Sequence, residues 1–234
     1  MRKILALVLC ACLLPLPVRA EEAPKYIALT FDDGPSGRFT RRLLDGLAER
    51  GAKATFFLCG YRLADYPQEA QRIFQEGHEI GIHGYSHQNM QYMSRREIDE
   101  EIRRTRQLLP EGCKPVWLRP PGGCCSDGVR QVAVCKNLGI LTWSVDPQDW
   151  NSKSSMAICQ AVVTGAKDGD VVLLHDMSDV SVDAALSIVD YLQAQGFVFV
   201  TVSELAKRRE VSVTPGEIYR RFQPQQTEKT PPTK

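Results

Sequence analysis

Residues 26–35 read YIALTFDDGP, and this stretch decides the fold. Its first part, Tyr26–Phe31, is an apolar run with β-branched and aromatic side chains, which predicts a buried strand. Asp32 and Asp33 follow at once, and Gly34-Pro35 is typical of a turn. The stretch therefore predicts a buried strand that ends in two neighbouring carboxylates.

Six more short apolar runs of the same kind follow along the chain. They cover Ala54–Leu58, Glu79–His83, Val116–Arg119, Ile140–Val145, Val171–Leu174 and Phe197–Val202. Amphipathic stretches separate them, and this alternation predicts a parallel α/β fold. Strands that are apolar throughout indicate a sheet covered on both faces. The pattern leaves two architectures open, an open doubly wound sheet and a closed or nearly closed barrel.

Several of the intervening stretches carry helix signals. Leucines at helical spacing predict a helix over Arg41–Arg50, and Ser94 with Glu97 forms a capping box for a helix that runs to Pro110. Further predicted N-caps are Ser126, Ser154 and Ser203.

The composition is that of one ordinary globular domain. The chain has 234 residues, of which 43% are hydrophobic and 24% charged, which excludes collagen-like, coiled-coil and wholly disordered proteins. The formal net charge of +1 argues against a nucleic-acid partner, because such proteins neutralise phosphates with an excess of Lys and Arg. No feature of the sequence indicates a protein partner.

The first twenty residues have the pattern of a secretory signal peptide. Arg2 and Lys3 precede an apolar run over Ile4–Leu16, and Ala20 ends a candidate cleavage site. We therefore predict a secreted or extracytoplasmic, cell-surface protein of bacterial type. The alternatives are an uncleaved anchor, the one case with membrane contact, and a lipid anchor near Cys10 and Cys12.

Cleavage would change both the charge and the cysteine count. It removes three of the 29 basic residues and none of the 28 acidic ones, leaving a formal charge of −2. Six of the eight cysteines remain: Cys59, Cys113, Cys124, Cys125, Cys135 and Cys159. They allow up to three disulfides, and free buried cysteines are an equal alternative. We predict a domain over residues 21–210 and a polar tail over 211–234, with Ile218, Tyr219 and Phe222 as residues that could dock.

Reactive side chains follow the predicted strands. They are Asp32 and Asp33, His83 with His87 four residues later, Arg119, Asp146 with Asp149, and His175. In parallel α/β folds, sites gather at the carboxyl ends of strands, so these groups should share one rim. Each motif alone is also typical of a turn, a loop or a core histidine; their joint occurrence indicates a site.

The set suits metal-assisted hydrolysis. Two imidazoles and one carboxylate can hold zinc and leave a position open. A second carboxylate can act as a base, and a separate histidine can protonate a leaving group. The residues therefore predict hydrolysis of an acyl group without a covalent intermediate.

The same residues resemble a known family. The segments Thr30–Pro35, His83-x-x-x-His87, Arg119-Pro120-Pro121, Asp146-x-x-Asp149-Trp150 and Leu173-Leu174-His175 are similar to the five ordered motifs of the polysaccharide deacetylases, carbohydrate esterase family 4. The resemblance covers residues 24–207. It implies a distorted (β/α) barrel with seven parallel strands, an N-acetylated polysaccharide substrate and a divalent metal, usually Zn²⁺.

The resemblance also implies roles for individual residues. Asp32 would be the general base, held by Arg119, and the metal ligands would be Asp33, His83 and His87.

The remaining positions complete the site that the resemblance implies. The backbone N–H of Gly122 would help to bind the oxyanion, and Trp150 and Leu173 would surround the acetyl methyl. His175 would be the general acid, oriented by Asp149.

Two positions depart from the family pattern. Gly84 stands where a Ser or Thr usually braces the metal-binding loop, and Gly122 stands where an aromatic residue is usual. We hypothesise that a disulfide from Cys124 or Cys125 restores rigidity to the second loop.

The sequence thus predicts an exported metal-dependent hydrolase. It would remove N-acetyl groups from an N-acetylglucosamine-containing polysaccharide, with peptidoglycan favoured, and release acetate. Chitin oligosaccharides and acetylxylan are alternative substrates. An alternative of another class is a carbohydrate-binding relative that has lost turnover through Gly84 and Gly122.

Overall fold

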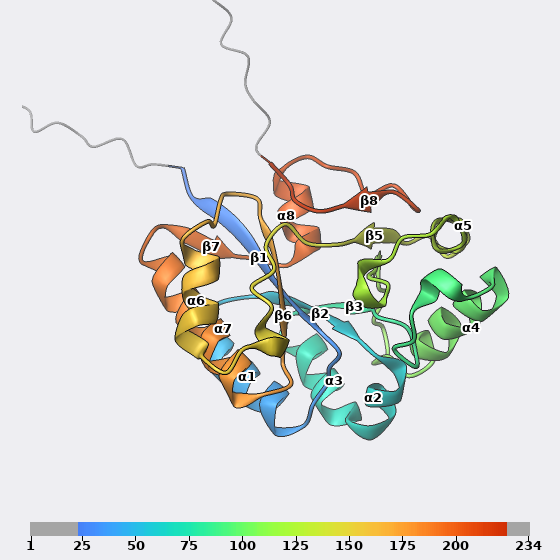
Figure 1. Ribbon diagram of the computed structural model, residues 1–234, viewed down its shortest axis with the longest axis horizontal. Helices are drawn as coiled ribbons and strands as arrows, with labels where there is room; N and C mark the ends of the chain where they lie inside the picture. The colour runs from blue at the N-terminus through green and yellow to red at the C-terminus, as the bar shows by residue number, and fades with distance from the viewer. Residues whose placement is uncertain (1–22, 224–234) are drawn as a thin grey trace, which may run out of the picture.

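The structure is a computed structural model that describes residues 23–223, and Figure 1 shows the course of its chain. Strands and helices alternate in this range, as the sequence predicts. The predicted signal peptide over residues 1–20 lies outside the described residues, as does the last part of the predicted tail. Within residues 23–223, every helix is too short or too polar to cross a bilayer.

All seven predicted strands are present, and they pair in parallel. They are β1 (Lys25–Asp32), β2 (Ala54–Leu58), β3 (Glu79–Ile82), β4 (Trp117–Leu118), β5 (Gly139–Leu141), β6 (Val171–His175) and β7 (Phe197–Phe199). The order across the sheet is β6-β1-β2-β3-β4-β5, and β7 pairs with the start of β1. The last six residues of β1 and all of β2 are buried, which confirms a sheet covered on both faces.

The sheet curls until its two ends meet. Beyond β5, the amides of Ser144 and Val145 donate to the Val171 carbonyl at 2.9 and 3.2 Å. The Leu173 amide donates back to the Val145 carbonyl at 2.9 Å. These bonds join the chain after β5 to β6, so the strands form a distorted, incompletely paired barrel. The structure thus confirms the barrel and excludes the open doubly wound sheet.

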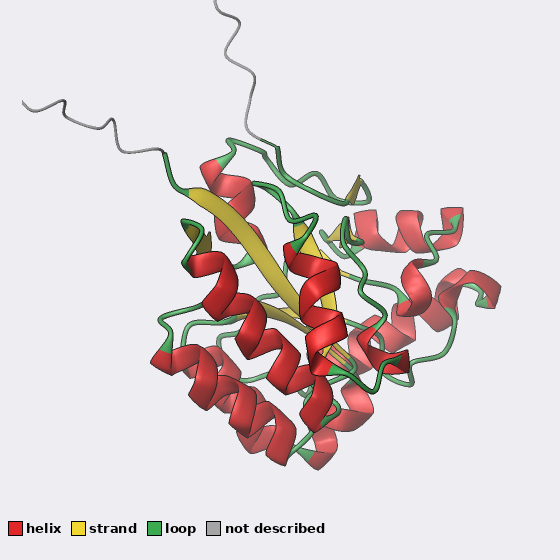
Figure 2. Ribbon diagram, turned by 60° about the vertical axis from the view of Figure 1, so that its left-hand side comes forward, coloured by secondary structure: helices red, strands yellow, loops and turns green. Residues whose placement is uncertain are grey.

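Helices surround the strands, as Figure 2 shows. They are α1 (Arg38–Glu49), α2 (Gly60–Asp65), α3 (Pro67–Gln75), α4 (Arg95–Arg106), α5 (Asp127–Cys135), α6 (Ser155–Val163), α7 (Asp179–Gln193) and α8 (Val202–Arg208). The largest core cluster packs β1 and β2 against α1 and α7, with Leu29, Leu43 and Ile188 fully buried. This packing fixes the orientation of β1, and with it the two carboxylates at its end.

Of the four predicted N-cap residues, three are confirmed and one is wrong. Ser94 forms the capping box with Glu97, and Ser126 and Ser154 each cap a helix. Ser203 does not, because the hydroxyl of Thr201 accepts from the Glu204 amide and starts α8 two residues earlier. The same cap explains why the last predicted strand ends before Val202.

The segment after α8 is part of the fold. The sequence predicts little fixed structure from residue 211, with three apolar side chains that could dock. In the structure, β8 (Ile218–Tyr219) pairs in parallel with β5 and lies beside it in Figure 1. Phe222 is buried against Trp117, and its amide donates to the Gly169 carbonyl at 2.8 Å. Residues 211–223 therefore complete one side of the barrel.

Candidate active site

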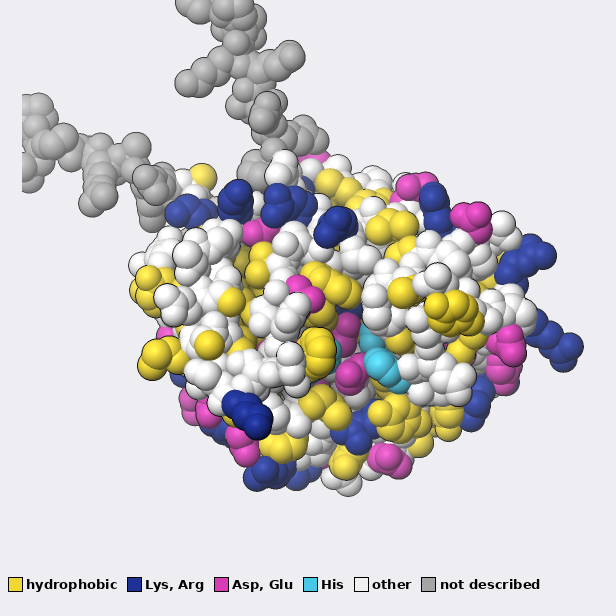
Figure 3. All heavy atoms as spheres, in the orientation of Figure 1, with side chains coloured by type: hydrophobic (Ala, Val, Ile, Leu, Met, Phe, Trp, Pro, Cys, Tyr) yellow, Lys and Arg dark blue, Asp and Glu magenta, His cyan; other side chains and the backbone are white. Residues whose placement is uncertain are grey.

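The polar residues that follow the strands converge on one rim of the barrel. Asp32 at the end of β1 is in register with His175 at the end of β6, and His83 directly follows β3. They open on a cavity of about 400 Å³. Its lining residues are Asp32, Asp33, His83, His87, Gly122, Trp143, Asp146, Trp150, Leu173 and His175. Figure 3 shows histidine and acidic side chains gathered in a hollow near the middle of this face.

Asp33, His83 and His87 form a three-ligand set in this cavity. Nε2 of His87 lies 3.0 Å from Oδ1 of Asp33, and Nε2 of His83 lies 3.3 Å from the same atom. The ligand atoms of all three residues lie within 4.8 Å of one another. Two imidazoles and a carboxylate suit a divalent transition metal, and three protein ligands leave coordination positions open.

The charge state of Asp33 fits a bound cation. Burial opposes ionisation of this carboxyl, but its interactions with His83 and His87 hold the pKa below the usual range. Its Oδ1 is buried and, among the described residues, is approached only by the two imidazole nitrogens and makes no well-formed hydrogen bond. A buried acceptor without a donor is costly, and a metal ion between the three residues would satisfy it. The residues present therefore fit a divalent metal.

A backbone contact fixes the orientation of the first histidine ligand. Nδ1 of His83 lies 2.7 Å from the carbonyl oxygen of Arg119. Because a carbonyl can only accept, Nδ1 carries the proton and donates. Nε2 then keeps its lone pair on the side of Asp33, which is the arrangement that a metal ligand needs.

Gly84 fits its position in the loop that carries His83 and His87. Its φ is +82°, a conformation that favours glycine. A Cβ at this position would lie 2.9 Å from Cε of Met90 and 3.2 Å from Oε2 of Glu101. The space that a Ser or Thr side chain would need is therefore occupied, and the loop is shaped around the glycine.

Asp32 is held from behind by a buried arginine. Arg119 has no exposed surface, and its Nη1 donates to Oδ1 of Asp32 at 2.7 Å and to the Thr30 hydroxyl at 2.8 Å. Its Nε donates to the Leu141 carbonyl at 3.1 Å, and its Nη2 donates to the Thr142 carbonyl at 2.8 Å. The other carboxylate oxygen of Asp32 lies 3.7 Å from Nε2 of His83, next to the candidate metal site.

His175, which is partly buried, forms a second pair with the buried Asp149. Nδ1 of His175 lies 2.8 Å from Oδ1 of Asp149, and the His175 amide donates to Oδ2 at 2.8 Å. Burial lowers the pKa of His175, but the Asp149 carboxylate outweighs it and raises that pKa to about 9. The imidazole is therefore protonated at neutral pH, with Nε2 on the side of Asp33, 3.9 Å from its Oδ2.

This pair makes a prediction about the titration of His175. In metal-free wild-type protein, NMR should show a pKa of His175 well above the usual histidine value of 6.5, at about 9. Asp149→Asn should lower that pKa by about one unit or more, because the opposite charge is lost. The wild-type imidazole therefore stays protonated to a higher pH, and the imidazole of the variant loses its proton at a lower pH. Equal pKa values in the two proteins would contradict the assignment of Asp149 as the cause.

The three predicted substrate-pocket residues also line the cavity. Gly122 lies in a 3₁₀ turn (Pro121–Gly123) with a φ of 67°. Leu173 is buried in β6, and Trp150 is 67% exposed in a second 3₁₀ turn (Asp149–Asn151). An exposed aromatic side chain beside the metal ligands can pack on a sugar or an acyl group.

The predicted disulfide at Cys124 or Cys125 is not formed. All six cysteines of the described residues are free thiols. The thiol of Cys125 donates to the Gly123 carbonyl at 3.3 Å, and the Gly123 amide donates to the Pro120 carbonyl at 2.8 Å. The loop is therefore closed by bonds to its own backbone. The structure supports free cysteines, but of the six only Cys59 is buried, and Cys135 is exposed.

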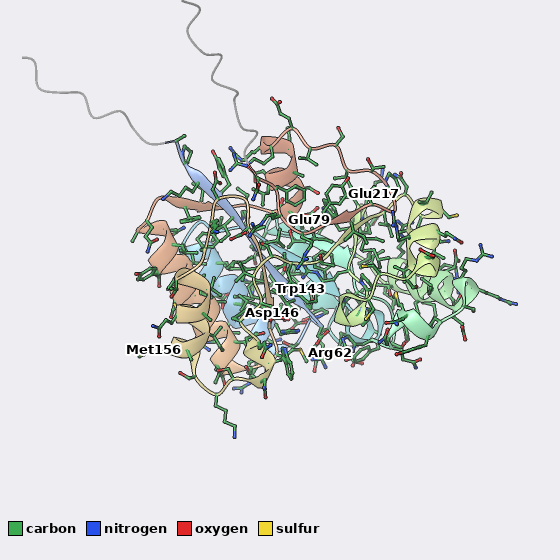
Figure 4. All side chains as sticks on the ribbon, turned by 45° about the horizontal axis from the view of Figure 1, so that its top comes forward. Arg62, Glu79, Trp143, Asp146, Met156 and Glu217 are labelled. Atoms are coloured by element: carbon green, nitrogen blue, oxygen red, sulfur yellow. The ribbon has the colours of Figure 1, made fainter. Side chains whose placement is uncertain are left out.

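Two further cavity residues come from the segment after β5. Figure 4 labels Trp143 and Asp146, which lie near the middle of the molecule, whereas Met156 lies on α6 at its edge. Sequence reasoning missed Trp143 because it assigned Ile140–Val145 to a buried strand. The strand ends at Leu141, so Trp143 lies in the loop that follows. A Cβ at Gly123 would lie 2.8 Å from the Trp143 ring. This close approach explains why the turn Pro121–Gly123 has a glycine at position 123.

The arrangement supports hydrolytic chemistry. The cavity holds a three-residue ligand set, a carboxylate on one side that can accept a proton, and an imidazolium on another that can donate one. Eight of the ten predicted site residues line the cavity, and Arg119 and Asp149 are the buried partners behind it. Acid, base and metal ligands in one cavity are the parts that metal-assisted acyl hydrolysis requires.

Comparisons with known proteins give the family. The polysaccharide deacetylase profile matches residues 19–142. A peptidoglycan-N-acetylglucosamine deacetylase of Bacillus cereus is 39% identical over 191 residues, which are 78% of this chain and 89% of that protein. Peptidoglycan-N-acetylmuramic acid deacetylase PdaC of Bacillus subtilis is 37% identical over 202 residues, which are 84% of this chain. The chain spans 43% of PdaC, less than half of its length.

The fold agrees with these sequence matches. The structure is similar to a family 4 acetyl xylan esterase from Clostridium thermocellum, solved in complex with a cobalt ion, with a TM-score of 0.79. The two are 32% identical, and the match covers 84% of this chain and 98% of the esterase. With the ordered motifs and the curled barrel, these findings show that the chain belongs to the polysaccharide deacetylase family, carbohydrate esterase family 4.

Proposed function

We propose that this chain is an exported, zinc-dependent hydrolase that removes N-acetyl groups from N-acetylglucosamine-containing polysaccharide, with peptidoglycan as the favoured substrate. The observation that carries the proposal is the cavity in which Asp33, His83 and His87 lie together, with Asp32 and His175 beside them. Exposed acidic groups often occur without a metal. Here one imidazole is fully buried and the carboxylate oxygen is orphaned, which supports a metal centre.

A zinc ion held by the three ligands would supply a Lewis acid that lowers the pKa of a bound water and polarises the acetyl carbonyl. Asp32 then acts as the general base and takes the proton of the attacking water. Arg119 holds one oxygen of this carboxylate, so the free oxygen faces the reaction.

The remaining residues complete the reaction. The Gly122 amide donates to the oxyanion that develops on the acetyl oxygen, while Trp150 and Leu173 enclose the acetyl methyl. His175 gives its proton to the departing nitrogen, and Asp149 keeps the imidazole oriented. Water adds to the acetyl carbon and the carbon–nitrogen bond breaks, so the products are acetate and a sugar with a free amine.

The relatives support peptidoglycan as the substrate. Two are named as peptidoglycan deacetylases, one for N-acetylglucosamine and one for N-acetylmuramic acid. A solved relative is an acetyl xylan esterase, so the same fold also serves an ester of another polysaccharide. The proposed location, secreted or at the cell surface, rests on the signal-like residues 1–20 and agrees with a substrate outside the membrane.

The test is acetate release measured in parallel on peptidoglycan, chitooligosaccharides and acetylxylan. We expect the highest rate on peptidoglycan, loss of the activity with a chelator, and recovery with added Zn²⁺. We expect the activity to recover because Asp33, His83 and His87 would serve the reaction only by holding a metal ion.

Three results would contradict the proposal or a part of it. Acetate release that persists after the metal has been removed would exclude metal dependence. Retained glycan binding without acetate release under any divalent metal would favour the carbohydrate-binding alternative. A higher rate on chitooligosaccharides or acetylxylan would overturn peptidoglycan as the substrate and leave the deacetylase chemistry standing.

A further inference from the structure

The loop that carries the two histidine ligands has an unusual backbone. Between β3 and the 3₁₀ turn Met90–Tyr92, Gly84 has a φ of +82° and His87 has a φ of +60°. A non-glycine residue adopts this left-handed region only when its surroundings hold it there. The orientation of the His87 ligand therefore depends on what fixes this loop.

One side chain binds the loop from α4. Oε2 of Glu101 accepts from the amides of Tyr85 at 2.7 Å and Ser86 at 2.8 Å, and Oε1 accepts from the Ser86 hydroxyl at 3.0 Å. Glu101 is 9% exposed and lies on the buried side of its helix, between Ile98 and Ile102. Three donors from two consecutive loop residues thus converge on one carboxylate.

The opposite side of the loop is bound by α2. The Gly60 amide donates to the Gly84 carbonyl at 2.9 Å, and the Tyr61 amide donates to the Tyr85 carbonyl at 3.0 Å. The loop is therefore held by donors from α2 on one side and by the Glu101 acceptor on the other.

The charge of Glu101 has no other partner in the described part of the chain. Within residues 23–223, no Lys, Arg or His lies within ion-pair distance of its carboxylate. Arg104, one turn along α4, instead stacks on the Tyr85 ring at 3.5 Å. A buried anion needs compensating donors, and here the loop before His87 supplies them.

We propose that Glu101 is a positioning residue of the metal site: its carboxylate fixes loop 83–87 so that His87 presents its imidazole to Asp33 and His83. The proposal rests on the proposed metal-dependent function. It also offers a reason why the chain tolerates glycine at position 84, because the loop is fixed by Glu101 on α4 and not by a hydroxyl at position 84.

The test is Glu101→Gln, which keeps the shape and can still accept from the two amides through its oxygen, but loses the negative charge that the three loop donors surround. We expect Zn²⁺ affinity, measured by competition with a chromophoric chelator, to fall by about 10–100-fold. The kcat should return close to the wild-type value at saturating Zn²⁺, with KM for the polysaccharide unchanged. Recovery with metal separates a positioning role from general unfolding.

The matched control is Glu100→Gln on the same helix. Glu100 is exposed and pairs with Arg103, so this variant should bind Zn²⁺ like wild type. Should Glu101→Gln fail to fold, Ser86→Ala removes one of the three donors and should weaken Zn²⁺ binding by roughly 2–10-fold.

The outcomes distinguish this inference from the proposed function. Wild-type Zn²⁺ affinity in a folded Glu101→Gln, or in Ser86→Ala if Glu101→Gln does not fold, would overturn the role of Glu101. A wild-type protein that binds no divalent metal would overturn the metal site itself.

Discussion

Asp32→Asn should lower kcat for acetate release by roughly 10²–10⁴-fold, the usual contribution of a positioned acid or base. The amide cannot take a proton from water, yet it has nearly the shape of the carboxylate and can still accept from Arg119. The ligands Asp33, His83 and His87 are unchanged, so Zn²⁺ affinity should stay close to wild type. The measurement is acetate release at saturating substrate and metal.

The control for Asp32→Asn is a carboxylate of the same kind far from the cavity. Asp45 on α1 pairs with Arg72 at the surface, and Asp45→Asn should leave kcat unchanged. Thermal unfolding of both variants shows whether each is folded. An Asp32→Asn protein that is folded, binds metal and keeps wild-type turnover would exclude Asp32 as the base.

His175→Gln should have the second large effect, and the size of that effect should depend on the leaving group. On an N-acetylated sugar we expect kcat to fall by roughly 10²–10⁴-fold, because the departing amine needs the imidazolium proton. On a nitrophenyl acetate ester the loss should be much smaller, since nitrophenolate leaves without protonation. The measurement is the ratio of the two rates in wild type and variant.

His78 provides the control for His175→Gln, because it lies outside the cavity. Nδ1 of His78 accepts from the Ala54 amide at 3.1 Å, at the opposite end of β2 and β3 from the site. His78→Gln should leave the ratio of amide to ester turnover unchanged even where it lowers stability. An equal loss on both substrates in His175→Gln would assign His175 to binding and not to proton donation.

Much of the site follows from the sequence because its chemistry is tied to strand ends. A run of apolar residues that ends in a polar motif predicts both a buried strand and the rim where its last side chain lies. This rule placed Asp32, His83 and His175 together although they are far apart along the chain. The barrel itself came from the resemblance, because periodicity does not distinguish curled from open parallel sheets.

The residues that sequence reasoning missed are fixed by contacts between distant segments. Glu101 stands within an apolar stripe, and a carboxylate at such a position is the signal that could have identified it. Trp143 was missed because the end of a strand is set by its pairing with neighbouring strands and not by composition alone. The sequence named Phe222 among three residues that could dock, but the segment around it is polar overall and so predicted little fixed structure; its contact with Trp117 places it in the core.

The position of β1 has a consequence for how the chain folds. Its neighbours include β6 and β7 as well as β2, and the Thr30 hydroxyl donates to the Val172 carbonyl across 142 residues of sequence. One edge of β1 thus stays unpaired until the last third of the polypeptide has been synthesised. Such distant pairing slows folding and exposes an apolar strand to aggregation in the meantime. The strand that ends in Asp32 is therefore translated first among the strands, and the strands that complete its pairing are translated among the last.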